Sequence, residues 1–286
     1  MEQKILVTGV TGTVGSEVIK ALLKKGIKVR AGVRSLAKIE NTPWKNQVEV
    51  VVFDYEQPEV LKNALKNITK LFFVSPPGSY TEKEIAESVL EQSRKQGLKY
   101  IVRLSGMGAD KHNLFANHQA ADNLLLSSKI DYTSLQPNTF MQNFYNYQTA
   151  IKEQDKIIEP AGKGKTSFID ARDIAEVAAT ILTETGHENK IYELTGGESL
   201  DYYQAAKLFS DVLGRTINYK PLSEQEYIKA KEAEGIPAEY SKKFMKFYKM
   251  VESDEYAHIS PIVEKILGRK PITLKQFIID YRDKFI

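Results

Sequence analysis

Short apolar runs alternate with amphipathic stretches through the first half of the chain. The runs predicted as strands are 5–7, 29–33, 48–53, 71–74, 100–104 and 132–135. After the first of them, Val18, Ile19 and Leu22 recur at helical spacing, which predicts a helix from Ser16 to Lys25. Strands rich in Val, Ile, Leu and Phe that alternate with helices indicate an α/β fold with a parallel sheet buried on both faces. We therefore expect a Rossmann-type, doubly wound sheet with ligands at the carboxyl ends of its strands.

The rhythm changes after Pro137. Residues 167–169 resemble one more strand, and 171–182 have a strongly helical pattern. Beyond Thr195 no strand pattern follows. We expect a dinucleotide-binding domain at 1–156, to which 166–196 returns, and a smaller, mainly helical C-terminal substrate lobe at 197–286 together with 157–165.

Three pairs of residues have the spacing of a helix capping box, in which a side chain on each partner bonds the backbone N–H of the other. They are Thr81 with Glu84, Asp201 with Gln204, and Ser223 with Glu226. Gly97 and Gly214 are the expected stops of the helices that begin at the first two boxes.

A glycine-rich segment, Thr8 to Gly15, directly follows the first predicted strand. Gly9 permits a tight turn, Gly12 a close approach of backbone to a pyrophosphate, and Gly15 close packing of helix on strand. The start of the following helix offers backbone N–H groups and a positive dipole end. We predict that this loop binds a dinucleotide through Gly9, Thr11, Gly12, Thr13, Val14 and Gly15.

Composition narrows the partners. The 286 residues include no Cys, no apolar run reaches the length of a membrane span, and the net charge is only +3. The first strand begins close to Met1 without a signal peptide, so we expect a cytoplasmic protein that binds a small molecule rather than nucleic acid or membrane. The four histidines show no paired ligand spacing, so no metal site is expected.

Several segments together resemble the NmrA-like family of atypical short-chain dehydrogenase/reductases, in particular its type 2 quinone reductases and triphenylmethane reductase. They are 8–15, Gly32-Val33-Arg34, Asp54-Tyr55, Tyr132-Thr133, Asp170-Ala171-Arg172-Asp173-Ile174-Ala175 and the segment 186–192. The resemblance implies a Rossmann domain that binds NADP(H), with a small C-terminal substrate lobe. The family also contains regulators that bind the cofactor without known chemistry.

The residue after the second strand indicates which nicotinamide cofactor binds. An NAD site places there a carboxylate for the ribose 2′-hydroxyl, whereas this chain has Arg34. A guanidinium can clamp a 2′-phosphate and stack on adenine, so we expect NADP(H) in preference to NAD(H). Lys38 adds a second charge there or is a solvated surface lysine. By the family pattern, Asp54 and Tyr55 contact the adenine end.

The usual acid pair of short-chain dehydrogenases is missing. Such enzymes set a Tyr and a Lys four residues apart, and on that pattern Leu114 takes the place of the tyrosine and His118 that of the lysine. Hydride transfer does not require a dedicated acid when the acceptor delocalises the incoming charge. We therefore predict a quinone or a similar planar conjugated acceptor.

The remaining candidates follow the later strands. The candidate catalytic residues are His118, Ser105 and Asn138. Alternatively, His118 has only a structural role, and Ser105 only forms a turn. The cofactor's nicotinamide half is expected to meet Ser75, Pro76, Pro77, Ser105, His118, Pro137 and Asn138. The predicted acceptor pocket is lined by Phe140, Met141, Phe144 and Tyr145, which core packing explains equally well.

Two functions remain open at this point. One is an NADPH-dependent oxidoreductase, monomeric or homodimeric. The other is a non-catalytic sensor of the NmrA-like kind, which binds NADP(H) and acts through protein partners.

Overall fold

The computed structural model describes residues 4–76, 81–109, 111 and 116–286. The chain divides into two compact units. The first comprises Met1–Pro137, Ala171–Leu194 and Ile266–Gly268, and the second Asn138–Asp170, Thr195–Lys265 and Arg269–Ile286. In this division the first unit is interrupted after Pro137, and the segment that follows the sixth strand groups with the helical unit.

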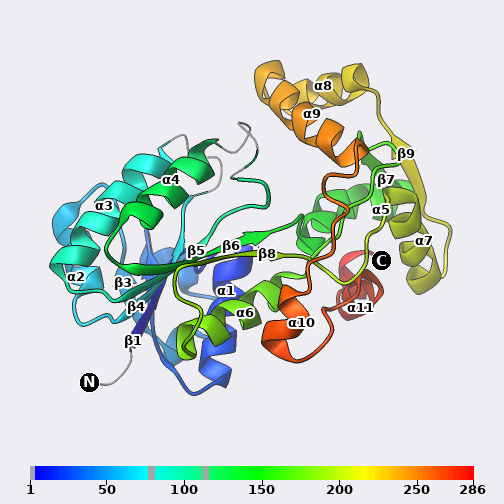
Figure 1. Ribbon diagram of the computed structural model, residues 1–286. Coiled ribbons are helices and arrows are strands. Elements are labelled where there is room, and N and C mark those ends of the chain that lie inside the picture. The colour runs from blue at the N-terminus through cyan, green and yellow to red at the C-terminus, as the bar shows by residue number, and fades with distance from the viewer. Residues whose placement is uncertain (1–3, 77–80, 110, 112–115) are drawn as a thin grey trace. The chain divides into compact units, whose positions relative to one another are not determined.

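The first unit is built on a parallel sheet (Figure 1). In order across the sheet, its strands are β3 (Glu49–Val52), β2 (Lys28–Val33), β1 (Lys4–Val7), β4 (Lys70–Val74), β5 (Tyr100–Leu104), β6 (Asp131–Pro137) and β8 (Lys190–Leu194). Every neighbouring pair is parallel. The predicted doubly wound sheet is confirmed, and its order reverses between β1 and β4, where ligands bind in such folds.

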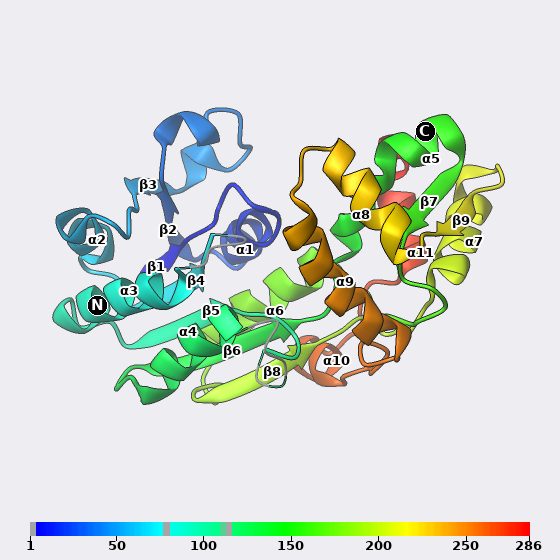
Figure 2. The ribbon, with the colours of Figure 1, turned by 90° about the horizontal axis from the view of Figure 1, so that it is seen from above.

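Helices cover both faces of this sheet (Figures 1 and 2). Helices α1 (Thr13–Lys24) and α6 (Ala171–Thr183) pack on each other at one face, and α2 (Pro58–Leu65), α3 (Glu82–Lys95) and α4 (Ala116–Ser127) cover the other. Alternate strand residues face opposite ways, so Leu71 and Phe73 join the core under α2 to α4. Burial on both faces explains why the inner strands β2, β1, β4, β5 and β6 are continuous apolar runs.

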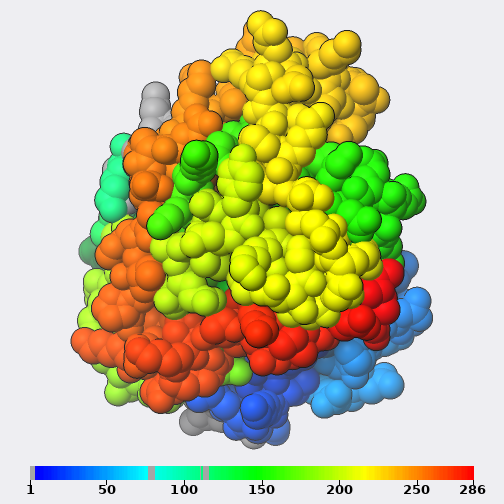
Figure 3. Space-filling model, turned by 90° about the vertical axis from the view of Figure 1, so that its right-hand side faces the viewer, coloured from blue at the N-terminus to red at the C-terminus, as the bar shows by residue number. Residues whose placement is uncertain are grey.

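The second unit is mainly helical. Its elements are η4 (Met141–Tyr147), α5 (Gln148–Gln154), β7 (Lys156–Glu159), α7 (Tyr202–Leu213), β9 (Asn218–Pro221), α8 (Glu224–Ala233), α9 (Ala238–Glu252), α11 (Leu274–Asp280) and η5 (Arg282–Lys284); α10 (Ile262–Leu267) begins in it. Helices α8 and α9 form a hairpin (Figure 2), and the C-terminal residues, red in Figure 3, lie against α7.

Two expectations about strands were wrong. The region beyond Thr195 does contain a strand, since β9 pairs in parallel with β7. Each is four residues long, too short for its alternation to show in the sequence. Conversely, residues 167–169 form no strand: Ile169 makes only an isolated bridge with Phe140.

The helix signals fared unevenly. The capping boxes of Asp201 with Gln204 and Ser223 with Glu226 are both formed, and Gly214 ends α7 in the left-handed conformation. Thr81 precedes α3 as expected, but its side chain makes no capping hydrogen bond. No helix in the described part of the chain has the length and apolarity that crossing a membrane requires.

Candidate dinucleotide and hydride-transfer site

The glycine loop turns tightly between β1 and α1. Gly9 has φ +65°, a conformation that favours glycine, and its carbonyl accepts the N–H of Gly12 at 2.9 Å. A Cβ on Gly15 would lie 2.3 Å from the carbonyl oxygen of Gly9, so only glycine lets the helix approach the loop this closely. The side chain of Thr8 ties the loop to β4, donating to the carbonyl of Phe72 at 3.2 Å.

The start of α1 is open to an anion. Gly12 is the N-cap, which offers no side-chain cap, and the first turn contains no acidic residue. Gly9, Thr11, Gly12 and Thr13 are exposed, whereas Val14 and Gly15 are buried. Exposed N–H groups at a positive helix end without a competing carboxylate fit a pyrophosphate.

Two cations follow β2 at the same edge of the sheet as the loop, because β1 and β2 run in parallel register. Arg34 and Lys38 are exposed, and neither side chain forms an ion pair or hydrogen bond with the rest of the described chain. Their charge is therefore available to a bound anion.

Asp54 and Tyr55 follow β3 as predicted, but each already accepts hydrogen bonds from the described chain. The Asp54 carboxylate accepts the backbone N–H of Glu56 at 3.0 Å and the Gln57 amide at 2.6 Å. The carbonyl of Tyr55 accepts the Ser88 hydroxyl at 2.9 Å. Their contact with adenine stays a prediction.

Ser75 and Pro76 follow β4, beside the glycine loop in strand order; Pro77 lies outside the described residues. Ser75 is 8% exposed, and its hydroxyl has no hydrogen-bond partner in the described chain. An unpaired buried hydroxyl costs free energy, and it calls for an explanation such as a ligand. It fits a polar group of the cofactor's nicotinamide half.

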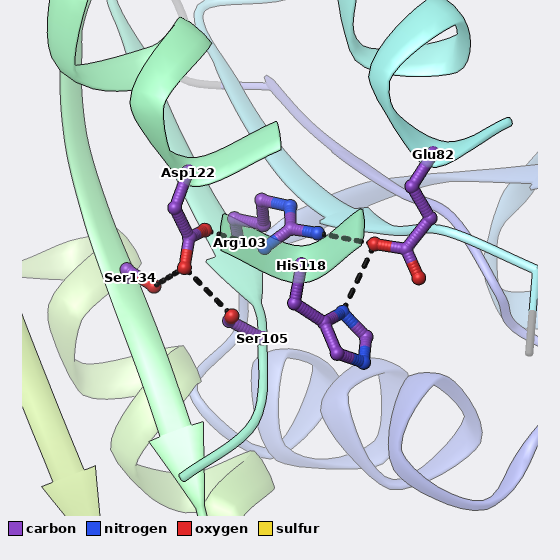
Figure 4. Close-up of polar contacts among 6 residues, drawn as sticks. All are labelled: Glu82, Arg103, Ser105, His118, Asp122 and Ser134. Atoms are coloured by element: carbon purple, nitrogen blue, oxygen red, sulfur yellow. Dashed lines mark hydrogen bonds and ion pairs between the residues drawn. The ribbon is translucent and has the colours of Figure 1, made fainter. Parts of the chain in front are cut away.

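A buried network of charges joins the two candidate catalytic residues of the first unit (Figure 4). The fully buried guanidinium of Arg103, on β5, lies between the carboxylates of Glu82 on α3 and Asp122 on α4. Nη2 of Arg103 lies 2.7 Å from Oε2 of Glu82, and Nη1 contacts Oδ1 of Asp122. In the described part of the chain, no three His, Asp or Glu side chains are placed to hold a metal ion.

The network determines what Ser105 can do. Its hydroxyl donates to Asp122 at 2.7 Å, and the Ser134 hydroxyl donates to the same oxygen at 3.3 Å. Because an ionised carboxylate only accepts, the proton of Ser105 is committed to Asp122. Ser105 is thus prepared to accept a hydrogen bond from a ligand, such as a carboxamide N–H, and not to donate one.

His118, on α4, meets the other end of the network. Its Nδ1 lies 2.9 Å from Oε2 of Glu82, the same oxygen that Arg103 contacts. The side chain is 34% exposed, and Nε2 points away from Glu82 (Figure 4). A Cβ on Gly106 would lie 4.0 Å from Nε2, so this edge of the ring faces the end of β5.

Asn138 and Pro137 differ from these two. Asn138 belongs to the second unit and is 2% exposed; its amide donates to Ser167 and to the carbonyl of Tyr256, at 2.7 and 2.8 Å. Its oxygen accepts the N–H of Thr139. These bonds explain its burial by structure alone, and a catalytic role stays a prediction. Pro137 ends β6, where its carbonyl accepts the N–H of Met107.

The four predicted pocket residues lie in the second unit, where two of them, Phe144 and Tyr145, pack against other aromatic rings. Phe144 is 1% exposed among Tyr147, Phe168 and Phe209. Tyr145 packs against Phe277 and Phe285. Met141 is 2% exposed, and Phe140 is partly exposed. Core packing therefore accounts for Phe144, and a pocket formed by these side chains stays a prediction.

The sequence reasoning missed Glu82, Arg103, Asp122 and Ser134. One signal was present: Arg103 is a charged residue inside an apolar strand, and such a residue must be paired when both faces of the sheet are covered. Its partners could not be chosen, because they come from two helices that are adjacent only in the fold.

The fold and the glycine loop define a Rossmann-type dinucleotide-binding protein. Residues 9–185 match the sequence profile of the NAD(P)H-binding family, and the chain belongs to this family.

Individual proteins similar to this chain are also reductases that use NAD(P)H. The chain is 32% identical over 280 residues to an NAD(P)H azoreductase of Xenophilus azovorans, with 96% of each covered. The structure of Citrobacter sp. triphenylmethane reductase complexed with NADP(H) matches with a TM-score of 0.85 at 29% identity, covering 96% of this chain and 99% of that one. The NADPH-dependent quinone oxidoreductase of Escherichia coli, complexed with NADPH, gives 0.87 at 26% identity, covering 98% and 99%. The chain is an NAD(P)H-dependent oxidoreductase, as the resemblance implied.

Proposed function

We propose that this oxidoreductase uses NADPH to reduce a quinone or a similarly planar, conjugated small molecule. The observation that carries the proposal is the carboxyl edge of β1 and β2. There α1 begins at the glycine loop without a side-chain cap, and Arg34 and Lys38 follow β2 with no ion pair to any described residue. The bound cofactor would supply the hydride. The chain's own residues would hold the cofactor. The glycine loop would bind its pyrophosphate, Arg34 would bind its 2′-phosphate, and Ser75 and Ser105 would contact its nicotinamide half.

Arg34 provides the preference for NADPH over NADH. Its guanidinium can form two parallel hydrogen bonds with a phosphate but can accept none from a ribose hydroxyl. In Arg34→Asp, the carboxylate repels a 2′-phosphate and accepts from a 2′-hydroxyl. The affinity for NADPH should fall about 100-fold, since a charged hydrogen bond contributes about 1.5–3 kcal/mol.

Calorimetric titration of both cofactors tests this preference. Affinity for NADH should be retained or improved in Arg34→Asp. The matched control is Arg94→Asp, which removes an exposed arginine near the end of α3 and should leave both affinities unchanged. An unaltered preference in Arg34→Asp would contradict the assignment.

The class of acceptor follows from the missing acid pair. His118 takes the place of the usual lysine, and Leu114, in the place of the tyrosine, lies outside the described residues. Without a phenol there, the acceptor must itself accommodate the incoming charge, and positioning of the reactants dominates catalysis. The related azoreductase, quinone oxidoreductase and triphenylmethane reductase are named for conjugated acceptors, which supports this choice. We assign acceptor binding to Phe140, Met141 and Tyr145 of the second unit, and leave out Phe144, whose burial core packing already explains.

Turnover separates the candidate functions. Purified protein should oxidise NADPH, followed by nicotinamide absorbance, when a quinone or a triphenylmethane dye cation is added. An unconjugated ketone of similar size should give no turnover. Tight cofactor binding without oxidation by any conjugated acceptor would favour the NmrA-like sensor over the enzyme.

A further inference from the structure

The contact between Glu82 and His118 determines which ring nitrogen carries a proton. Glu82 Oε2 lies 2.9 Å from Nδ1, at ion-pair distance but without the alignment of a hydrogen bond, and a negative carboxylate this close repels the lone pair of a bare imidazole nitrogen. A proton on Nδ1 turns the repulsion into attraction. The neutral ring therefore keeps its proton on Nδ1 and leaves Nε2 as the nitrogen that exchanges protons.

The rest of the network keeps Glu82 in this position. Glu82 is 3% exposed and receives the guanidinium of Arg103 at 2.7 Å on the same oxygen that faces His118. Arg103 is itself fixed on its other side by Asp122. A buried arginine cannot lose its proton, so the guanidinium attracts the Glu82 carboxylate permanently and keeps it in place. Its site at the first turn of α3 favours negative charge as well.

We propose that Glu82 is a positioning residue that holds His118 so that its Nε2 donates the second proton of quinone reduction. This inference rests on the proposed function. A quinone gains two electrons and two protons to become a hydroquinone, and the hydride supplies both electrons and one proton. Hydride addition leaves the hydroquinone monoanion; the protonated ring of His118 donates a proton from Nε2 to its oxygen, and becomes neutral with Nδ1–H toward Glu82. The ring edge is partly exposed, so water returns the proton to Nε2.

A second acceptor makes the proposal testable, because it needs no proton. Hydride addition to a triphenylmethane dye cation gives a neutral product directly. Removing the proton donor should therefore impair quinone reduction and spare dye reduction, whereas damage to the cofactor site or to the fold should impair both.

The variants are His118→Gln, Glu82→Gln and the control Glu87→Gln, which changes an exposed glutamate on the same helix. For the first two, kcat with the quinone should fall about 100-fold, within the usual contribution of a general acid, while kcat with the dye stays within about twofold. The control should match the wild type with both acceptors. Equal losses with both acceptors, or no loss with the quinone, would overturn the proposal.

Histidine nitrogen NMR of the wild type tests the positioning without turnover, and without relying on Glu82→Gln to fold. The resonances of His118 are those missing from His118→Gln. Its neutral ring should carry the proton on Nδ1, and a proton on Nε2 would overturn the proposal. A wild type that reduces neither acceptor would contradict the proposed function and leave this measurement as an independent test of positioning.

Discussion

Each of the two units contains a carboxylate withdrawn from water, and the two are stabilised in opposite ways. Glu82, in the first unit, meets charged or chargeable partners: Arg103 at 2.7 Å and His118 at 2.9 Å. Glu159, in the second unit, instead receives the hydroxyl of Tyr147 and is also hydrogen-bonded by Tyr248. The partner of Glu82 is an opposite charge, whereas the partners of Glu159 are neutral hydrogen-bond donors.

The consequences for ionisation differ. Burial raises the pKa of Glu159 even though the bonds from Tyr147 and Tyr248 and the charge of Lys231 lower it. Burial also raises the pKa of Tyr147 and Tyr248 well above the usual range for tyrosine, so both remain proton donors. The hydrogen bonds from the two phenols favour the charged carboxylate less than burial disfavours it, so the pKa of Glu159 is raised. Glu82 is thus paired with a permanent positive charge, whereas at Glu159 burial favours the neutral carboxyl group.

Removing the arginine tests this contrast with the largest expected effect. Arg103→Met keeps much of the side-chain volume but leaves Glu82 and Asp122 buried without their cation. Breaking a buried ion pair from one side costs about 3–5 kcal/mol, and we expect a loss of this size in the free energy of unfolding, measured in urea. The control Arg94→Met alters an exposed arginine and should change stability by less than about 0.5 kcal/mol. Comparable stabilities would show that the network needs no charge.

An intermediate effect is expected from Asp122→Asn, which keeps the shape of the side chain but removes one charge. Arg103 retains Glu82, so the loss should be about 2 kcal/mol, near the value of one charge-assisted hydrogen bond. The matched control is Asp211→Asn, an exposed residue paired with Lys207 at 3.3 Å on α7. Urea unfolding of both variants checks the size. A loss as large as that in Arg103→Met would mean that Glu82 contributes nothing to holding the guanidinium.

These networks also mark the limit of prediction from the sequence. Five of the six strands of the first half were predictable because burial on both faces makes each an apolar run; the remaining one, β3, lies at the edge of the sheet and is partly exposed, but is still rich in Val. The glycine loop was predictable because its glycines meet local steric needs. Ser105 and His118 could be placed at strand and helix ends by pattern alone. Their shared connection through Arg103 could not, since Glu82 and Asp122 lie 21 and 19 residues from it along the chain and meet it only across helix packing.

The second unit was harder to predict from the sequence for a related reason. Strands β7 and β9 are separated by some sixty residues, as their register of Ile157 with Tyr219 shows, and each alternates over only four positions. Aromatic residues there carried no sign of whether they line a pocket or a core. Phe144 is buried because it packs among other rings, and these contacts arise only in the tertiary structure, so the sequence alone does not show them.

The smallest effect, with the opposite sign, is expected for Glu159→Gln. A group whose pKa is raised in the folded state contributes stability that is complete below its unfolded pKa and is lost as pH rises through the folded pKa. Glutamine can still accept from Tyr147 and Tyr248 but never ionises. The variant and the wild type should have similar stability near about pH 4, where glutamate is largely protonated, and the variant should become the more stable one by about 1 kcal/mol toward neutral pH. Urea unfolding across this range measures the difference, and Glu153→Gln, at an exposed glutamate on α5, should show none. A wild type that gains stability over the variant as pH rises would mean that the phenols favour the charged carboxylate more than burial disfavours it, and the contrast between the two sites would disappear.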